Sequence, residues 1–221
     1  SFDVDSLKKA CRDKPGSVLI LCSPNNPTGG SLSREEIEEI LDVHTGFFIL
    51  DQAYVEFGGF NAIPLISRYP NLIITRTFSK AFAAAGLRLG YMIGSPEIIA
   101  EINKIKLPYN VNFFSEHVAS VLIRNRPLLD NTIKEIISER ESLLQVLRSL
   151  PFDNVYPSES NFILVRTETK QALFDFLKSK GILIRDVSKY PMLQNCLRIS
   201  IGKPEENALL KDALREYFSS R

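Results

Sequence analysis

Short apolar runs alternate with amphipathic stretches through the first half of the chain, and this alternation constrains the fold more than any other feature. After the run VLILC comes SREEIEEILDVH, in which Ile37, Ile40 and Leu41 recur at helical spacing behind Ser33, an expected N-cap. Parallel strands covered by helices on both faces read as continuous apolar segments. The pattern predicts an α/β fold with a mostly parallel sheet covered by helices. The expected strands are 17–24, 46–54, 71–81 and 90–94.

The second half of the chain changes pattern and predicts a smaller domain. Residues 97–149 read as mainly helical, with a break around 107–114. Short apolar runs then return around a helix that Gly181 closes. We therefore expect a large α/β domain over 1–149 and a small α+β domain over 150–221. The elements expected in the small domain are strands within 154–167, 182–187 and 196–202 and helices over 171–181 and 206–218.

Composition excludes several classes of protein. The chain is 44% hydrophobic, enough for a core, yet no apolar run approaches the roughly 18 residues that cross a bilayer. A net charge of +1 gives no field that would recruit nucleic acid or an acidic membrane, so neither partner is expected. Cys11, Cys22 and Cys196 lack metal-ligand spacing. They are typical of reduced thiols in a cytoplasmic protein without a metal site.

Polar side chains follow three successive strands of the predicted sheet. Asn26 comes after the apolar run VLILC, Asp51 ends the run that begins FFIL, and Thr77, Ser79 and Lys80 follow the run LIIT. Ligands of open α/β sheets bind beyond the carboxyl ends of the strands, where these groups would converge. Each residue alone is weak evidence, since a single Asp at a strand end is more often a cap. Their joint occurrence predicts a ligand site.

The chemistry of this set matches the demands of pyridoxal phosphate (PLP). The PLP aldehyde needs a lysine that forms a Schiff base, and its ring nitrogen needs a fixed carboxylate to stay protonated. Its 3-oxygen needs neutral donors, and its phosphate needs hydroxyls and a guanidinium. Lys80, Asp51 and Asn26 meet the first three demands, and Arg88 lies downstream of the hydroxyls.

Four motifs occur in an order that resembles a known family. NNPTG (25–29), DQAY (51–54), TFSKAFAAAGLRLGY (77–91) and CLRISIG (196–202) are similar to motifs of the fold-type I PLP-dependent aminotransferases. The chain most resembles the histidinol-phosphate aminotransferases among them, from its first residues to its last. The lysine and C-terminal arginine motifs are highly specific in combination. The resemblance implies the fold-type I architecture and a cis peptide at Asn26–Pro27.

The resemblance also implies a role for each motif residue. Lys80 would bind the PLP aldehyde, and Asp51 would pair with the ring nitrogen. Arg198 would bind the substrate α-carboxylate, and Arg185 the phosphate of the substrate. The remaining cofactor contacts would be Tyr54 and Asn26 at the 3-oxygen and Thr77, Ser79 and Arg88 at the phosphate.

The activity implied is transamination of histidinol phosphate with 2-oxoglutarate, a step of histidine biosynthesis, by a cytoplasmic homodimer. Three alternatives stay open: another aminotransferase or a threonine-phosphate decarboxylase, a PLP-binding sensor domain of a transcription regulator, and an inactive fragment. The chain begins at Ser1 without a Met. We expect it to be the C-terminal part of such an enzyme, and to bind PLP weakly and transaminate little by itself.

A few polar residues have plainer readings. Gln52 stands where many similar proteins have Glu in DEAY, and strand alternation predicts that it points away from the cofactor ring, so that this difference should have little effect. His44 and His117 lie in helical contexts and are expected to be structural or exposed. Arg185 could be a solvated residue or an ion pair with its neighbour Asp186, although the motif around it favours a substrate contact.

Overall fold

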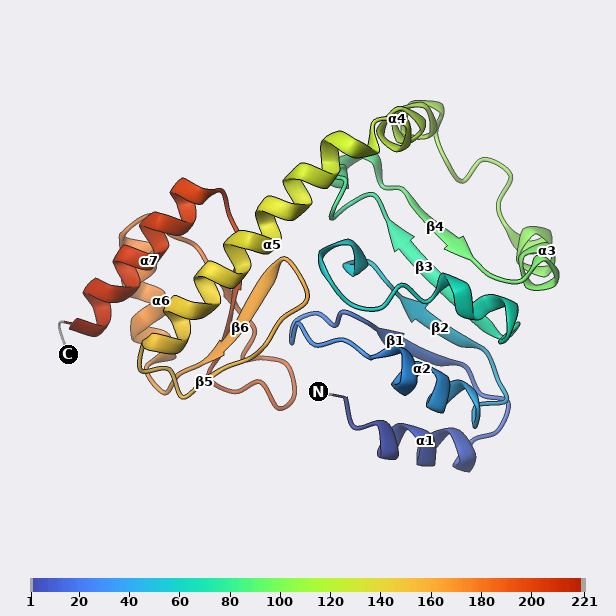
Figure 1. Ribbon diagram of the computed structural model, residues 1–221, viewed down its shortest axis with the longest axis horizontal. Helices are drawn as coiled ribbons and strands as arrows, with labels where there is room; N and C mark the ends of the chain where they lie inside the picture. The colour runs from blue at the N-terminus through green and yellow to red at the C-terminus, as the bar shows by residue number, and fades with distance from the viewer. Residues whose placement is uncertain (1, 220–221) are drawn as a thin grey trace. The chain divides into compact units, whose positions relative to one another are not determined.

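The computed structural model describes residues 2–219, which form two compact units (Figure 1). The first unit comprises the chain up to Asn25 together with Gly30–Asp130. The second comprises Asn26–Gly29 and the chain from Asn131 onward. Each unit has its own four-stranded sheet and its own hydrophobic core.

The sheet of the first unit has the strand order β1-β2-β3-β4, and its first three strands are parallel, as the sequence predicted. β4 runs antiparallel to β3. Because Cys22 pairs with Asp51 and Asp51 with Thr75, the carboxyl ends of these strands are aligned. The strands are β1 (Leu19–Cys22), β2 (Phe48–Asp51), β3 (Leu72–Thr77) and β4 (Gly90–Ile93).

Helices of the first unit begin where their capping residues place them. Ser33 caps α2 (Arg34–Leu41) in a capping box with Glu36, and Ile37 and Ile40 of this helix are fully buried. α1 (Val4–Asp13) packs against α2 (Figure 1). The other elements of this unit are α3 (Pro96–Ile105), α4 (Phe113–Arg124) and the short 3₁₀ helices η1 (Val55–Phe57), η2 (Ile63–Ser67) and η3 (Ala85–Leu87).

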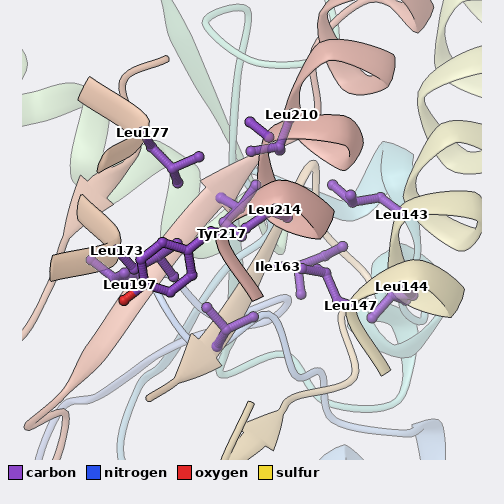
Figure 2. Packing of buried hydrophobic residues seen from close by; sticks show 13 residues of the cluster. Leu143, Leu144, Leu147, Ile163, Leu173, Leu177, Leu197, Leu210, Leu214 and Tyr217 are labelled. Carbon is purple, nitrogen blue, oxygen red and sulfur yellow. The ribbon is translucent and has the colours of Figure 1, made fainter. Parts of the chain in front are cut away.

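The second unit is an antiparallel sheet packed against helices, with the strand order β5-β6-β8-β7. Its apolar core is drawn from both layers, and Figure 2 shows Leu147, Ile163, Leu197 and Leu214 meeting there. The elements are α5 (Arg126–Ser149), β5 (Asn154–Val155), β6 (Phe162–Arg166), α6 (Lys170–Ser179), β7 (Arg185–Asp186), β8 (Cys196–Ser200) and α7 (Pro204–Ser219).

Two boundaries differ from the sequence-based expectation. The division between the units falls inside α5, before residue 149, because Leu143 and Leu147 of this helix are buried in the second unit's core. The strand expected over 182–187 is reduced to β7. Gly181 is left-handed at φ +78°, and the amide of Ile182 still bonds Leu177, so the end of α6 occupies residues expected to be extended.

The break expected around 107–114 is present, between the end of α3 and the start of α4. Across residues 2–219, no helix is both long enough and apolar enough to cross a membrane.

Candidate active site

Asp51 supplies a fixed carboxylate at the carboxyl end of β2. It lies in register with Cys22 on β1 and Thr75 on β3, and its side chain is half-buried. The amide of Ala53 donates a 3.0 Å hydrogen bond to Asp51 Oδ1. The carboxylate is therefore held by its own backbone turn at the sheet edge where the sequence predicted a ligand.

Lys80 and Tyr54 lie together on the loops that follow β3 and β2. Lys80 Nζ is 5.3 Å from the centroid of the Tyr54 ring, and Tyr54 is buried, with 5% of its surface exposed. Lys80 itself is exposed. Within residues 2–219, its amine has no hydrogen bond and no ion pair. An unpaired amine beside a phenol is a candidate nucleophile.

The turn after β3 presents hydroxyls and a guanidinium. Thr77 Oγ1 accepts a 3.1 Å hydrogen bond from the amide of Ser79 and lies 3.4 Å from the carbonyl of Leu89. Arg88 adopts a left-handed backbone conformation with φ 51°, and its exposed Nη1 lies 3.3 Å from the Ala85 carbonyl. These donors belong to one loop, as expected from the motif.

The buried side chain of Phe78 anchors that loop to the hydrophobic core. Its ring is buried and lies 4.7 Å from the ring centroid of Phe82, and Ala119 of α4 packs in the same cluster. The amide of Phe78 also donates to the carbonyl of Leu89 at 3.1 Å, which joins the two ends of the loop. Apolar packing therefore sets the position of the polar residues on either side of Phe78.

In the second unit, residues 26–29 are docked onto the segment before β6. The carbonyl of Gly29 accepts a 2.8 Å hydrogen bond from the amide of Glu159. Gly29 has φ +80°, and a Cβ there would overlap the side chain of Ser158, so only glycine fits. The Asn26–Pro27 peptide is cis, as predicted, and so is Ser23–Pro24, which the sequence analysis missed.

Arg198 and Arg185 lie opposite each other in the pairing of β8 with β7. Arg198 Nη1 donates to Asn26 Oδ1, and its guanidinium carbon lies 4.9 Å from the centroid of the Phe162 ring. Its Nε is buried and has no partner among the described residues. Like charges directly opposite on neighbouring strands are destabilising. Two facing arginines with an unused buried donor suit an anionic ligand.

Asp186 does not neutralise Arg185, so the ion-pair reading of this arginine is wrong. Asp186 Oδ2 instead accepts from Lys170 Nζ at 2.8 Å, and its Oδ1 accepts from the amide of Ser188. In the described part of the chain, no carboxylate lies within ion-pair distance of Arg185, Arg198, Arg88 or Lys80.

The two histidines behave as expected. His44 is 3% exposed and its Nε2 lies 3.2 Å from the carbonyl of Phe47, while His117 is exposed and stacks on Phe113. Gln52 is buried, with 1% exposed, and bonds Arg76. The sequence analysis did not single out this arginine, although its place between two threonines on a strand would direct it to the opposite face.

Comparison with known proteins gives a consistent result. Residues 1–214 match the family described as aminotransferase class I and II. The histidinol-phosphate aminotransferase of Chlorobaculum tepidum is 40% identical over 217 residues, which cover 98% of this chain and 62% of that protein. The chain thus spans less than two thirds of the length of this relative.

Solved structures match along nearly the whole chain. The histidinol-phosphate aminotransferase of Clostridium acetobutylicum has a TM-score of 0.91 at 26% identity, and the match covers 100% of this chain and 69% of that one. The enzyme of the same name from Sinorhizobium meliloti, in complex with pyridoxal-5'-phosphate, has a TM-score of 0.85 at 27% identity, with 99% and 61% covered.

Proposed function

This chain belongs to the aminotransferase class I and II family, and from that membership we propose that it carries the catalytic lysine of a PLP-dependent aminotransferase. Its fold is the predicted fold-type I PLP-dependent transferase fold. The proposed reaction converts histidinol phosphate and 2-oxoglutarate into imidazole acetol phosphate and glutamate. The observation that carries the proposal is the unpaired amine of Lys80 beside the buried ring of Tyr54.

The residues present fit PLP by their chemistry. The free amine of Lys80 suits the aldehyde, and the held carboxylate of Asp51 suits a protonated ring nitrogen. The phenol of Tyr54 and the amide of Asn26 suit the 3-oxygen. The hydroxyls and the guanidinium between the end of β3 and the start of β4 suit the phosphate. They belong to Thr77, Ser79 and Arg88.

When bound, PLP supplies an electron sink for the negative charge that develops at the substrate Cα. Lys80 Nζ would take the proton from the Cα of the amino donor, acting first as a base and then as an acid. Asp51 would keep the ring nitrogen protonated. A carboxylate held by a backbone amide is suited to this role, because it does not have to be reoriented as charge develops.

Substrate binding is assigned to the facing arginines of β7 and β8. Arg198 would bind the α-carboxylate of glutamate and 2-oxoglutarate through a guanidinium fork that matches carboxylate geometry. Arg185 would bind the phosphate that only histidinol phosphate carries. The absence of an acidic partner within residues 2–219 supports both assignments.

Borohydride reduction tests the proposed function. The protein saturated with PLP should show a visible absorption band, and reduction should fix the cofactor covalently on Lys80. Peptide mapping then locates the label. Recovery of the label on Lys104 or Lys106, or the absence of a visible band, would refute the assignment.

The proposal includes a homodimer in the cytoplasm. The three cysteines are free, which supports a reducing compartment. Apolar side chains exposed between α3 and α5 support association with another chain. They include Ile105, Leu107, Tyr109, Phe113 and Phe114.

A further inference from the structure

Gln52, next in sequence to Asp51, is a buried residue at the centre of a hydrogen-bond network. Its Oε1 accepts a 3.0 Å bond from Arg76 Nη2, and its Nε2 donates a 2.7 Å bond to the carbonyl of Phe60. The same Arg76 nitrogen lies 2.6 Å from Asn61 Oδ1. One amide side chain therefore joins β3 to the segment that follows β2.

This network holds the segment 52–63 at both of its ends. At the first end, the amide of Gln52 also donates to the carbonyl of Thr75 at 2.9 Å. At the other end, Asn61 Oδ1 accepts from the amide of Ile63, where η2 begins. Tyr54 lies between these two anchors, so its position depends on both.

Arg76 needs these neutral acceptors because its surroundings are poorly solvated. Its Nε is buried and has no partner in the described part of the chain. Burial raises the pKa of the nearby Glu56 carboxyl, although the positive charges of Arg76 and Arg126 act to lower it. Among the described residues, Glu56 forms no ion pair with either arginine. Removing an acceptor would leave a partly buried charged donor with an unsatisfied N–H group, which is costly.

The network requires an amide at residue 52 rather than a carboxylate. A glutamate could still accept from Arg76, but an ionised glutamate has no proton to donate to the carbonyl of Phe60. Two acceptor oxygens would then face each other across the 2.7 Å that now holds a hydrogen bond. The glutamine of DQAY is therefore matched to its surroundings.

We propose that Gln52 is a positioning residue, which fixes Asp51 and Tyr54 for the cofactor by tying their segment to Arg76. Asp51 precedes Gln52 by one residue and Tyr54 follows it by two. A shift of the Gln52 side chain is thereby transmitted through the backbone to the carboxylate and the phenol. This inference rests on the proposed PLP-dependent function.

The test uses Gln52→Glu and Gln52→Met, with Gln145→Glu on the exposed face of α5 as the matched control. Hydrogen–deuterium exchange of residues 52–63 is measured without cofactor, and should be faster in both Gln52 variants and unchanged in the control. With PLP, both variants should bind the cofactor roughly tenfold to a hundredfold more weakly. The pH at which the visible absorption of bound PLP changes should also move.

A double variant distinguishes the loss of the hydrogen bond with Arg76 from a general destabilisation of the fold. Removing both partners of a buried hydrogen bond is better tolerated than removing one. Adding Arg76→Met to Gln52→Met should therefore restore part of the lost PLP affinity.

Unchanged hydrogen–deuterium exchange in the Gln52 variants would overturn the inference, whether or not their PLP affinity changes. Faster exchange with unaltered PLP affinity and an unaltered absorption titration would also overturn it, because Gln52 would then be structural alone. A wild-type protein without a PLP absorption band would refute the proposed function, and the positioning role would fall with it. The exchange measurement distinguishes these cases because it needs no cofactor.

Discussion

Arg198 Nη1 donates a 2.8 Å hydrogen bond to Asn26 Oδ1, although the two residues lie 172 positions apart in the chain. In the proposed site, Asn26 would bind the 3-oxygen of the cofactor and Arg198 would bind the α-carboxylate of glutamate or 2-oxoglutarate. One side-chain amide would then serve both binding events. The hydrogen bond therefore gives a physical route by which the cofactor and the substrate each fix the other's contact.

Asn26→Ala should weaken the use of both amino donor and amino acceptor. It removes both the acceptor that orients Arg198 and the proposed contact with the 3-oxygen of the cofactor, and losing a hydrogen bond to a charged group costs about 1.5–3 kcal/mol. We expect kcat/KM to fall roughly tenfold to a hundredfold in both half-reactions, measured by single-turnover absorbance. Asn103→Ala, on the exposed surface of α3, is the control and should have no effect. Unchanged kinetics for Asn26→Ala would contradict the coupling.

Arg185→Ala should separate the two half-reactions. Without this guanidinium, kcat/KM for histidinol phosphate should fall roughly tenfold to over a hundredfold, while the glutamate half-reaction is spared. Arg198→Ala should impair the glutamate half-reaction, because glutamate carries an α-carboxylate and histidinol phosphate carries none. The exposed Arg148→Ala serves as the control. Equal losses for Arg185→Ala in the two half-reactions would refute the division of roles.

The pair of Asp186 with Lys170 should make stability depend on pH. Burial raises the pKa of Asp186, but hydrogen bonds from Lys170 and Ser188 and the charge of Lys170 outweigh it and lower the pKa from 3.8 to about 2. A lowered carboxyl pKa stabilises the fold above pH 3.8, and this contribution is lost as the pH falls towards 2. Because the Asp186 side chain is 35% exposed, solvent screening reduces the contribution of this ion pair to the free energy of unfolding to about 1 kcal/mol.

Asp186→Asn should therefore lower the free energy of unfolding at pH 7 by about 1 kcal/mol. The difference from the wild type should shrink below pH 4, measured by urea unfolding at a series of pH values. Asp175→Asn, at an exposed position of α6, provides the comparison. A difference that stays constant down to pH 2 would show that the charge of Asp186 is not its cause.

Ser33→Ala should destabilise the first unit. The Ser33 hydroxyl accepts from the amide of Glu36, and the Glu36 carboxylate accepts from the amide of Ser33 in return. Losing an N-cap of this kind costs about 1 kcal/mol of unfolding free energy, measurable by chemical denaturation. Ser33→Asp should retain most of the stability. If the alanine variant is as stable as the wild type, the capping box is not formed in solution.

The exposed apolar side chains between α3 and α5 should drive self-association of the 221-residue chain. Tyr109 is 95% exposed and Phe114 78% exposed. Light scattering after size-exclusion chromatography should show species larger than a monomer, and Tyr109→Ser with Phe114→Ser should reduce them. Leu183→Ser, at an exposed position of the second unit, is the control. A monomer at all concentrations would contradict the prediction.

The sequence was most informative where a local pattern decides the structure. Apolar runs located the three parallel strands, and Ser33 located the start of α2. The order of motifs located the loop that carries Lys80. These features depend on residues close in sequence, so one stretch of chain is enough to predict them.

Features that depend on distant residues were not predicted. The hydrogen bonds of Arg76 reach Gln52 and Asn61, which lie 24 and 15 positions away, and strand alternation predicts only the direction of each side chain. β7 begins later than expected because the hydrogen bonds that close the end of α6 extend to the amide of Ile182, which bonds the carbonyl of Leu177. An ion pair of Asp186 with its neighbour Arg185 was one of the alternatives left open, because Lys170, the actual partner of Asp186, becomes adjacent only in the fold.

Residues 26–29 belong to the second unit although the chain on either side of them belongs to the first, and this affects how the two units can be separated experimentally. The chain crosses from one compact unit to the other after Asn25, returns at Gly30 and crosses again after Asp130. A single proteolytic cut or a single gene truncation at residue 130 would release a C-terminal piece in which Arg198 has lost its acceptor Asn26. The second unit is thus built from two separate stretches of the gene. A recombinant protein that carries this unit whole must include residues 26–29 of the NNPTG loop as well as the C-terminal stretch.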